Sequence, residues 1–388
     1  MASKTSLDTQ VELAERARDV TFAMCAGCLG NLLITPGLWL TNRFYPFTPV
    51  FECITPFPNP IDGLVYALLI ALFLVLAASK NPRSILLLAA SLCGVLALQD
   101  QSRWHPWCYW YFAIILALLS FHSDLENVRR KASAINMCRL LLCCAYFWGG
   151  LQKLNVAFIH GLFPRIISPV LTDSSIVAPL AIFIAIWETA VGLSLLNQRT
   201  RMLGVISAIV LHSSILLFLG PLGHATNSNV WPWNVTVAFL VYFLFARNSD
   251  ASALDILVPR SFVHVCGGLL FGILPLFTFF NLFDTYPGFS LWSGSHRSAY
   301  FEIDENAKQG LPLHIANYLD GNILPVSKWA LGELNTPEYA EVRIYKRLLW
   351  YLCSQTGESP GIRLIVLAKP DRRTGVQSEE LKASCELQ

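Results

Sequence analysis

Three ionisable side chains interrupt long apolar stretches of this sequence: Lys153, Glu188 and His212. Lys153 closes the run CCAYFWGGLQK, Glu188 lies inside AIWETAVGL, and His212 lies inside AIVLHSSILLFL. An ionisable group in an apolar span is costly unless it is paired or hydrated, so it marks a candidate functional site. Apolar surroundings favour the neutral amine of a lysine, which can accept a proton. The chemistry that these residues favour is proton transfer.

Each of the three residues also has a structural interpretation. Lys153 ends its apolar run, so its amine can reach the lipid headgroups as an anchor. Glu188 can be one half of a structural ion pair, and His212 can be a core histidine bonded to a neighbour. The sequence leaves these alternatives open. Convergence of the three side chains on one cavity would favour an enzyme over a non-catalytic scaffold.

The composition indicates that helices in a membrane position these residues. The chain has 388 residues, of which 54% are hydrophobic and 14% charged, with a mean hydropathy of +0.49. Soluble domains carry about 25% charged residues. Nine apolar runs approach the roughly 20 residues that span a bilayer. The predicted spans are 20–41, 63–80, 83–99, 106–122, 135–153, 176–197, 202–220, 231–247 and 261–282.

The distribution of charge predicts a topology and three regions. Lysines and arginines gather in the N-terminal segment and in alternate loops, which places the N-terminus in the cytoplasm. Nine spans then place the C-terminus in the lumen or outside, in the endoplasmic reticulum or plasma membrane. We expect a cytoplasmic segment 1–19, a transmembrane domain 20–282 and an extramembrane tail 283–388. A net charge of +2 argues against a nucleic-acid partner, and no metal site is predicted.

Two polar-aromatic segments lie on the same predicted side of the membrane as Lys153. They are QDQSRWHPWCYWY (99–111) and GPLGHATNSNVWPWN (220–234). The second segment is either an ordinary loop with an aromatic belt or the lip of a pocket, where irregular backbone is tolerated. Polar groups that converge in an apolar cavity are the usual form of a binding site. The candidate substrate-binding residues in these segments are Asp100, Trp104, Tyr109, His224, Asn227, Trp233 and Asn234.

The tail changes to mixed polar composition, which predicts a small α+β domain. We expect strands at 290–292 and 299–303 around a turn at 293–295, a helix over 337–353 and a strand over 362–368. The last dozen residues are expected to be disordered. One disulfide among Cys53, Cys353 and Cys385 is compatible with the sequence, which does not assign it. Cys25 and Cys28 are either packed hydrophobes or a redox pair.

The segment AYFWGGLQKLNVAFIHG (145–161) resembles the part of vitamin K-dependent γ-glutamyl carboxylases that holds the catalytic lysine. The resemblance extends over roughly 60–245 and also includes the wider carboxylase-like (HTTM-type) membrane proteins. It implies an all-α polytopic bundle. The matching positions are Asp100, Trp104, Tyr109, Tyr111, Tyr146, Gly149, Gly150, Lys153, Leu154, Asn155, Gly161, Glu188, Arg201 and His212.

This resemblance implies a specific chemistry. In that family a lysine removes a proton from a reduced naphthoquinone, and oxygen adds to give a strongly basic alkoxide. That base abstracts a carbon-bound proton, carbon dioxide captures the carbanion, and the quinone leaves as an epoxide. By this resemblance Lys153 is the base, and His212 and Asn155 orient or stabilise charged oxygen. Tyr146 belongs to the substrate-binding set, and Trp104, Tyr109 and Trp233 stack on a flat lipophilic ring.

The chain departs from the carboxylases in ways that change the expected substrate. The animal enzymes have a much larger lumenal part, Trp107 replaces a histidine, and Gln152 replaces a second lysine. We therefore expect a membrane oxidoreductase or lyase that acts on a quinol-like or isoprenoid small molecule with Lys153 as base. A reduced quinone with O2 would be the cofactor pair, with CO2 if the chain is a carboxylase. The alternatives are a true peptidyl-glutamate γ-carboxylase and a non-catalytic scaffold or lipid-binding subunit.

Overall fold

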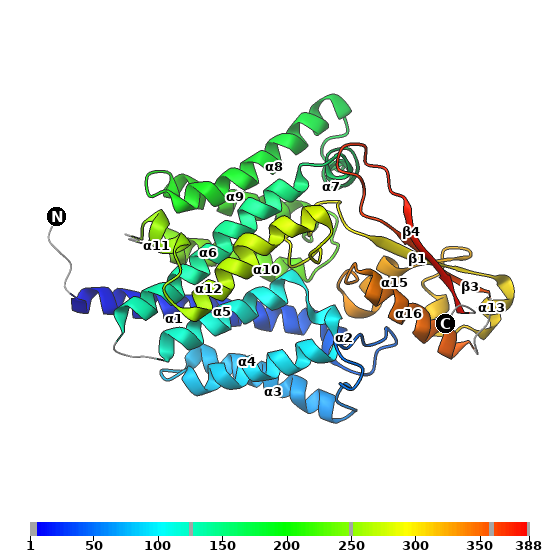
Figure 1. Ribbon diagram of the computed structural model, residues 1–388, viewed down its shortest axis with the longest axis horizontal. Coiled ribbons are helices and arrows are strands. Elements are labelled where there is room, and N and C mark those ends of the chain that lie inside the picture. Colours follow the sequence, from blue (N-terminus) through cyan, green and yellow to red (C-terminus); the bar gives the residue numbers. More distant parts are fainter. Residues whose placement is uncertain (1–5, 124–126, 248–250, 357–360, 386–388) are drawn as a thin grey trace.

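A bundle of apolar helices carries a smaller α+β domain at one end, as the computed structural model shows (Figure 1). The structure describes residues 6–123, 127–247, 251–356 and 361–385. The bundle comprises α1 (Ser6–Ile34), α2 (Pro36–Trp39), α3 (Ile61–Ala78), α4 (Arg83–Gln99), η1 (Gln101–Arg103), α5 (Pro106–His122), α6 (Val128–Lys153), η2 (Phe158–Leu162), α7 (Phe163–Ile167), α8 (Ser174–Leu196), α9 (Arg201–Leu219), α10 (Val230–Val241), η3 (Tyr242–Ala246), α11 (Ala253–Leu257), α12 (Phe262–Gly267), η4 (Gly268–Ile273) and η5 (Leu274–Phe280).

Six helical runs among the described residues are long and apolar enough to cross a bilayer. They are α1 from Leu7, α3, α6, α8, α9 and the run Phe262–Phe280 that joins α12 to η5. The predicted spans 83–99, 106–122 and 231–247 correspond to shorter apolar helices, namely α4, α5 and α10 with η3. The predicted helical membrane bundle is therefore supported, whereas length and composition identify six of the nine predicted crossings.

Helix α1 begins at Ser6, well before the predicted start of the first span at residue 20. Its polar first half is held by the end of η3. The guanidinium of Arg16 donates to the carbonyl oxygens of Leu244 and Arg247, and Arg247 pairs with Asp19 at 2.5 Å. These polar contacts stabilise the part of α1 before residue 20, which is too polar for hydropathy to predict as part of the span.

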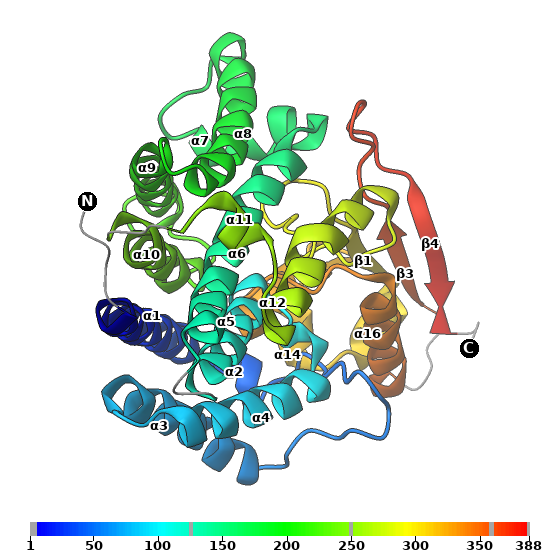
Figure 2. The ribbon, with the colours of Figure 1, turned by 60° about the vertical axis from the view of Figure 1, so that its left-hand side comes forward.

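The central helix α6 lies between α5 and α8 (Figure 2). Two glycines let α6 and α8 approach closely. A Cβ atom on Gly150 would lie 2.4 Å from the backbone nitrogen of Thr189, and one on Gly192 would lie 2.6 Å from the carbonyl oxygen of Cys143. Any larger side chain at either position would force the helices apart. The close approach brings Lys153 on α6 beside Glu188 on α8.

The C-terminal domain packs helices against a four-stranded antiparallel sheet in the order β2-β1-β3-β4. The buried side chains of Phe301, Trp329, Leu348 and Leu364 form its core. Its elements are β1 (Ser298–Ile303), α13 (Glu305–Gly310), α14 (Leu313–Ala316), β2 (Ile323–Pro325), α15 (Val326–Leu334), α16 (Val342–Gln355), β3 (Ile362–Leu367) and β4 (Glu379–Ser384).

Three details of the predicted tail are wrong. Residues 290–292 form no strand, because Phe289 and Trp292 adopt positive φ angles of 58° and turn the chain toward the bundle. The predicted helix over 337–353 begins only at Val342. The last residues were expected to be disordered, yet Glu379–Ser384 pairs with β3 as β4; residues 386–388 lie outside the described part.

A disulfide joins Cys353 at the end of α16 to Cys385 after β4, while Cys53 is a free exposed thiol. The bond closes a loop over a sequence separation of 32. We expect Cys385→Ser to destabilise the domain by about 2–4 kcal/mol, because the unfolded chain loses this constraint. Denaturant unfolding in detergent measures the change, with Cys53→Ser as control. Equal unfolding midpoints for wild type and Cys385→Ser would contradict the prediction.

The C-terminal domain is joined to the bundle by polar contacts at the end of α15. The carboxylate of Glu333 accepts hydrogen bonds from the backbone nitrogens of Phe44 and Tyr45, at 2.6 and 2.7 Å. Asn335, which ends α15 with a φ of 52°, donates to the carbonyl oxygen of Ile34 and to the hydroxyl of Ser228. These bonds fix the domain against both α1 and the 220–234 segment.

Glu338 is a buried carboxyl group at this junction, and only 4% of the residue is exposed. Burial raises the pKa of Glu338 from 4.5 to about 7. Below about pH 4.5 this carboxyl group is protonated in both the folded and the unfolded chain, so its burial costs no folding stability through ionisation. Stability is then lost as the pH rises through 7, because ionisation in the folded state costs energy.

Replacing Glu338 with glutamine should therefore stabilise the protein only at higher pH. We expect a gain of about 3 kcal/mol or less at pH 8, and none at pH 4, since one pKa unit corresponds to about 1.4 kcal/mol. Thermal unfolding of both proteins across this range measures the difference. A gain independent of pH would show that packing, rather than ionisation, is responsible.

Candidate functional site

A cavity of about 360 Å³ opens within the bundle between α5, α6, α8, α9 and α10. Its walls are mostly apolar, with side chains such as Phe158, Ile184 and Phe218. The 289–292 turn of the C-terminal region contributes Phe289, Leu291 and Trp292. The polar side chains at its walls are Tyr109, Tyr146, Lys153, Glu188, His212, Ser214 and Asn234.

Lys153 and Glu188 form an ion pair at the cavity wall. The Lys153 Nζ to Glu188 Oε2 distance is 2.6 Å, and the side chains are only 14% and 13% exposed. The amine also donates to the carbonyl oxygen of Gly149 at 3.4 Å. The pair lies at the close contact of α6 and α8. An amine and a carboxylate at this distance can exchange a proton directly.

A second polar set links Tyr146, His212 and Asn234. The Tyr146 hydroxyl lies 2.6 Å from His212 Nε2, and His212 Nδ1 lies 2.7 Å from Asn234 Oδ1. The Asn234 amide nitrogen donates to the carbonyl oxygen of Val230 at 2.7 Å, which leaves its oxygen facing His212. This orientation assigns the proton of neutral His212 to Nδ1. Nε2 therefore accepts a hydrogen bond from the hydroxyl group of Tyr146.

Both polar sets face one cavity because of helix periodicity. Tyr146, Gly149 and Lys153 are three and four residues apart on α6, so they share one face of the helix. The three residues that the sequence identified by their cost in an apolar span, Lys153, Glu188 and His212, all line the cavity. The cavity can therefore bring two separate proton-transfer groups to the same apolar ligand.

The predicted binding residues divide into two groups. Tyr109, Tyr146, Trp233 and Asn234 line the cavity with the three ionisable residues. The others lie outside its lining, and four of the five have side-chain hydrogen bonds within the protein. The five are Asp100, Trp104, Asn155, His224 and Asn227.

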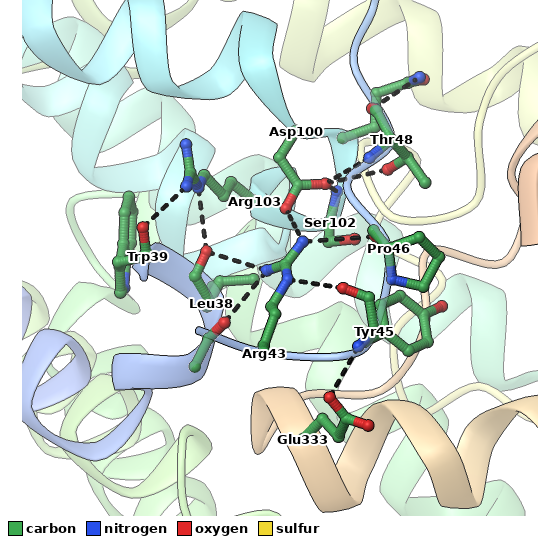
Figure 3. Close-up of polar contacts among 12 residues, drawn as sticks. Leu38, Trp39, Arg43, Tyr45, Pro46, Thr48, Asp100, Ser102, Arg103 and Glu333 are labelled. Carbon is green, nitrogen blue, oxygen red and sulfur yellow. Dashed lines mark hydrogen bonds and ion pairs between the residues drawn. The ribbon is translucent and has the colours of Figure 1, made fainter. Parts of the chain in front are cut away.

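Asp100 is fully buried at the end of α4, where it contacts the loop that follows α2 (Figure 3). Its carboxylate pairs with Arg43 at 2.5 Å and accepts hydrogen bonds from the backbone and hydroxyl of Thr48. It also caps η1 by accepting from the backbone nitrogen of Ser102. Every oxygen is used, so Asp100 orders the loops rather than binding a ligand in this cavity.

Asn155 caps the junction after α6 instead of stabilising a substrate oxygen. Its amide donates to the carbonyl oxygens of Gln152 and Ser293 and accepts from the backbone nitrogen of Phe158. His224 bonds to the carbonyl oxygen of Ile166 at 2.9 Å. These side chains satisfy backbone groups at helix ends, which are left without partners by the helix itself.

Trp104 and Asn227 also lie away from the cavity. The Trp104 indole donates to the carbonyl oxygen of Ala97, and its ring meets Tyr339 edge-on at 6.1 Å between centroids. Asn227 adopts a φ of 51° in the turn before α10. A left-handed backbone is common for asparagine in turns, which accounts for the residue type there.

Sequence reasoning missed two of the aromatic side chains at the cavity, Trp110 and Trp292, whereas it predicted Trp233. Trp110 and Trp233 meet edge-on at 5.4 Å, and neither indole nitrogen has a hydrogen-bond partner among the described residues. Trp110 directly follows Tyr109, so the aromatic density of the segment was the available signal. Trp292 comes from a turn that had been predicted as a strand, and no sequence signal placed it near α6.

Arg372, in the connection between β3 and β4, contacts the end of α6, the helix that carries Lys153. Its guanidinium donates to the carbonyl oxygens of Leu151 and Leu154 at 3.0 and 3.1 Å, and to the Gln152 side chain at 3.1 Å. Its carbonyl oxygen accepts from the backbone nitrogen of Val156. A cation at a helix C-terminus satisfies its last carbonyls and its dipole. Arg372 thus fixes the turn that carries Lys153.

A scan against protein-family models, a search of curated proteins and a search of solved structures each found no match. Among the described residues, no group of three or more His, Cys, Asp or Glu side chains could hold a metal ion. The interpretation of the cavity therefore depends on its own geometry.

Gly149 leaves room for the ion pair. A Cβ atom there would lie 2.9 Å from Glu188 Oε1 and 3.9 Å from Lys153 Nζ. We expect Gly149→Ala to displace the Glu188 carboxylate from the Lys153 amine. Labelling of Lys153 by a lipophilic, amine-reactive reagent should then rise about two- to fivefold. Peptide mass spectrometry measures the labelling. Gly161→Ala, where a Cβ meets nothing within 4 Å, is the control. Unchanged labelling in Gly149→Ala would contradict a spacer role.

Proposed function

We propose that this chain is an integral membrane enzyme that removes a proton from a lipophilic small molecule, with Lys153 as the base. One observation carries the proposal, namely that Lys153, Glu188 and His212 line a single apolar cavity. An apolar cavity with a few convergent polar groups is the usual form of a small-molecule site. The resemblance of 145–161 to carboxylase-like membrane enzymes supports the same assignment of Lys153.

The ion pair provides a route to a neutral base. When the ammonium proton of Lys153 passes to Glu188 over 2.6 Å, a neutral amine faces the cavity. The amine then accepts a proton from the substrate, and the Glu188 carboxyl group holds the first proton until it is released. Glu188 therefore acts as the proton store for Lys153.

The second polar set provides a relay for a hydroxyl group. A substrate O–H donates to the oxygen of Tyr146, whose own proton passes to His212 Nε2. Asn234 accepts from Nδ1 throughout and so keeps the imidazole in place. Hydrogen bonds to a developing oxyanion stabilise it most in a cavity that excludes water. Tyr146 is thus proposed to hold the substrate oxygen that becomes charged.

The walls favour a flat, lipophilic substrate that carries oxygen atoms. Tyr109, Trp110 and Trp233 supply ring surfaces, and the hydroxyl of Tyr146 can hydrogen-bond to a substrate oxygen. A quinol-like or isoprenoid compound has this chemistry. With O2 as oxidant the outcome would be epoxidation related to vitamin K-dependent carboxylation, which makes the chain an oxidoreductase or lyase of the carboxylase-like type.

Comparative profiling of lipophilic compounds tests this function. Cells that produce the wild-type chain should differ from cells with Lys153→Ala in at least one quinone- or isoprenoid-like compound. Lys346→Ala on the exposed face of α16 is a matched lysine control and should give the wild-type profile. Identical profiles for wild type and Lys153→Ala would reject catalysis by this lysine.

A lipid-binding scaffold is the second candidate, because the Lys153 amine already has a partner in Glu188, as in a structural ion pair. The two functions differ in what Lys153→Arg does. An arginine preserves the pair but cannot serve as a neutral base. A scaffold would keep its ligand and function with arginine, whereas the enzyme would lose turnover.

We also propose nine membrane crossings, with the N-terminus in the cytoplasm and the C-terminal domain in the lumen or outside. The alternation of positive charge between loops supports this topology. The Cys353–Cys385 disulfide adds support, because disulfides persist in oxidising compartments. Labelling of Cys53, on the same predicted side as the tail, by an impermeant maleimide from either face of sealed vesicles tests it. Labelling from the cytoplasmic face alone would reject it.

A further inference from the structure

Trp292 lies in the segment that joins η5 to β1, and its side chain lines the Lys153 cavity. The residues that follow it are held to the end of α6. Asn155, two residues after Lys153, donates to the carbonyl oxygen of Ser293 at 2.8 Å. A Cβ atom on Gly294 would lie only 3.0 Å from the backbone of the segment that follows Asn155. These contacts place Trp292 beside the chain that directly follows Lys153.

The backbone of Trp292 adopts a left-handed conformation, with a φ of 58°. Six non-glycine residues in the described part of the chain have positive φ angles, and three of them are asparagines, which tolerate this conformation. The same conformation is strained for a residue with a bulky side chain, so it persists only where other interactions compensate. Strained residues of this kind gather at ligand-binding sites, which makes Trp292 a candidate for such a role.

Phe289 has the same φ of 58°, and its packing accounts for it. Phe289 is buried, and its ring contacts those of Tyr109, Trp110 and Phe271 at centroid distances of 6.3, 6.4 and 6.2 Å. Trp292 lacks this compensation. It is only half-buried, and its indole makes no aromatic contact and no hydrogen bond within the described part of the chain. Ring contacts and hydrogen bonds inside the protein therefore do not explain a tryptophan at this position.

The indole nitrogen of Trp292 is available to a ligand. Trp110 and Trp233 also line the cavity and have unpaired indole nitrogens, but those two atoms are buried and have almost no accessible surface. The Trp292 Nε1 atom is unpaired among the described residues and is not one of the buried atoms, so it is accessible. An indole N–H group only donates, so its partner must be an acceptor. An oxygen atom of the substrate meets this requirement.

We propose that Trp292 is a substrate-binding residue of the Lys153 cavity, whose indole packs on the ring of the substrate and whose N–H donates to a ring oxygen. The strained backbone is retained because it holds the indole at the cavity wall. The donor distinguishes an oxygenated ring from a hydrocarbon of the same shape, because only the first can accept its hydrogen bond. The inference rests on the proposed function, which assigns the substrate of this cavity.

Binding is measured in the full-length Lys153→Met protein, the parent for these variants, so that turnover does not intervene. The probes are a 2,3-dialkyl-1,4-naphthoquinone that carries a diazirine and the naphthalene with the same substituents but no oxygen. The concentration dependence of photolabelling at cavity peptides, read by mass spectrometry, gives both affinities. Trp292→Phe keeps an aromatic ring and removes the N–H group. The ratio of quinone affinity to naphthalene affinity should therefore fall about three- to tenfold, the effect of one lost hydrogen bond.

Trp292→Asn separates ligand binding from a packing role. Asparagine tolerates the left-handed backbone, so the thermal unfolding midpoint should stay at or above the parent value. The affinity for both probes should fall about tenfold, because the ring surface is lost. Ala225→Asn is the control, since Ala225 has a φ of 51° and lies outside the cavity lining, and it should keep both affinities. A lower midpoint with unchanged affinities would show that Trp292 only packs.

Two other results would overturn the inference. An unchanged affinity ratio in Trp292→Phe would reject the hydrogen bond, and a parent protein without labelled cavity peptides would reject binding beneath Trp292. The proposed function fails in a different measurement, namely turnover that survives Lys153→Met in a protein that keeps Trp292. That result would leave the affinities of the Trp292 variants unaltered.

Discussion

Turnover of the lipophilic substrate is expected to fall by about 10²–10⁴-fold when Lys153 is replaced by methionine, the range for loss of a general base. Methionine keeps the length and apolar stem of the side chain while removing the amine. The fall should appear mainly in kcat, because the amine acts on the reacting proton. A short-chain naphthoquinol with O2 is the first substrate to assay, by quinol consumption and product mass.

Lys153→Arg is the decisive companion to this variant. The guanidinium keeps a positive charge beside Glu188, so folding stability should stay close to wild type. It remains protonated and cannot accept the substrate proton, so turnover should be as low as in Lys153→Met. Full activity in Lys153→Arg would show that the pair is structural. Glu188→Gln should also lower turnover, because an amide cannot store the proton released by Lys153.

Loss of the Tyr146–His212 relay is expected to have the next largest effect, about 10²-fold on turnover. Tyr146→Phe removes only the hydroxyl, and His212→Gln keeps a polar side chain that cannot accept the proton. Since the two residues are proposed to act as one unit, the double variant should be no slower than either single variant. Turnover of the four proteins under one set of conditions measures this.

Two further variants make the relay test specific. Asn234→Leu removes the acceptor that fixes the proton on His212 Nδ1, so turnover should fall even though Tyr146 and His212 are both present. His224→Gln is the control, because His224 bonds to a backbone oxygen outside the cavity lining. Additive losses in the double variant, or an equal loss in His224→Gln, would contradict a relay.

The sequence predicted the ionisable members of the cavity because their signal is energetic and local. Glu188 and His212 each stand out inside an apolar helix, and only pairing or hydration can offset their cost. Lys153 stood at the end of its span, where the sequence left both an anchor in the headgroups and a base open. The identity of its partner depended on the packing of α6 against α8, which hydropathy does not specify.

Polar residues near helix ends were harder to interpret. Asp100 and Asn155 have the side chains of a binding site, yet both satisfy backbone groups where a helix stops. A capping residue and a ligand-binding residue have the same local sequence, because both require a short side chain with an acceptor oxygen. Only the three-dimensional positions of Arg43, Thr48 and Phe158 separate the two roles.

The tail was predicted in its class and less well in its details. Alternating apolar residues predicted β1 and β3, whereas β4 is polar and was missed. An edge strand with charged side chains has little hydrophobic pattern, so its pairing with β3 and the Cys353–Cys385 bond could not be inferred from periodicity. The turn at 289–292 was missed because non-glycine residues there adopt positive φ angles.

The contact between Arg372 and the end of α6 has a consequence for the biogenesis of this protein. All bundle helices precede the C-terminal domain in the chain, so they are synthesised and inserted first. The turn that follows Lys153 gains the Arg372 contacts only after residue 372 has been made and the surrounding domain has folded. A nascent or truncated chain that lacks residue 372 would therefore insert into the membrane without these contacts at the turn that follows Lys153, the proposed base.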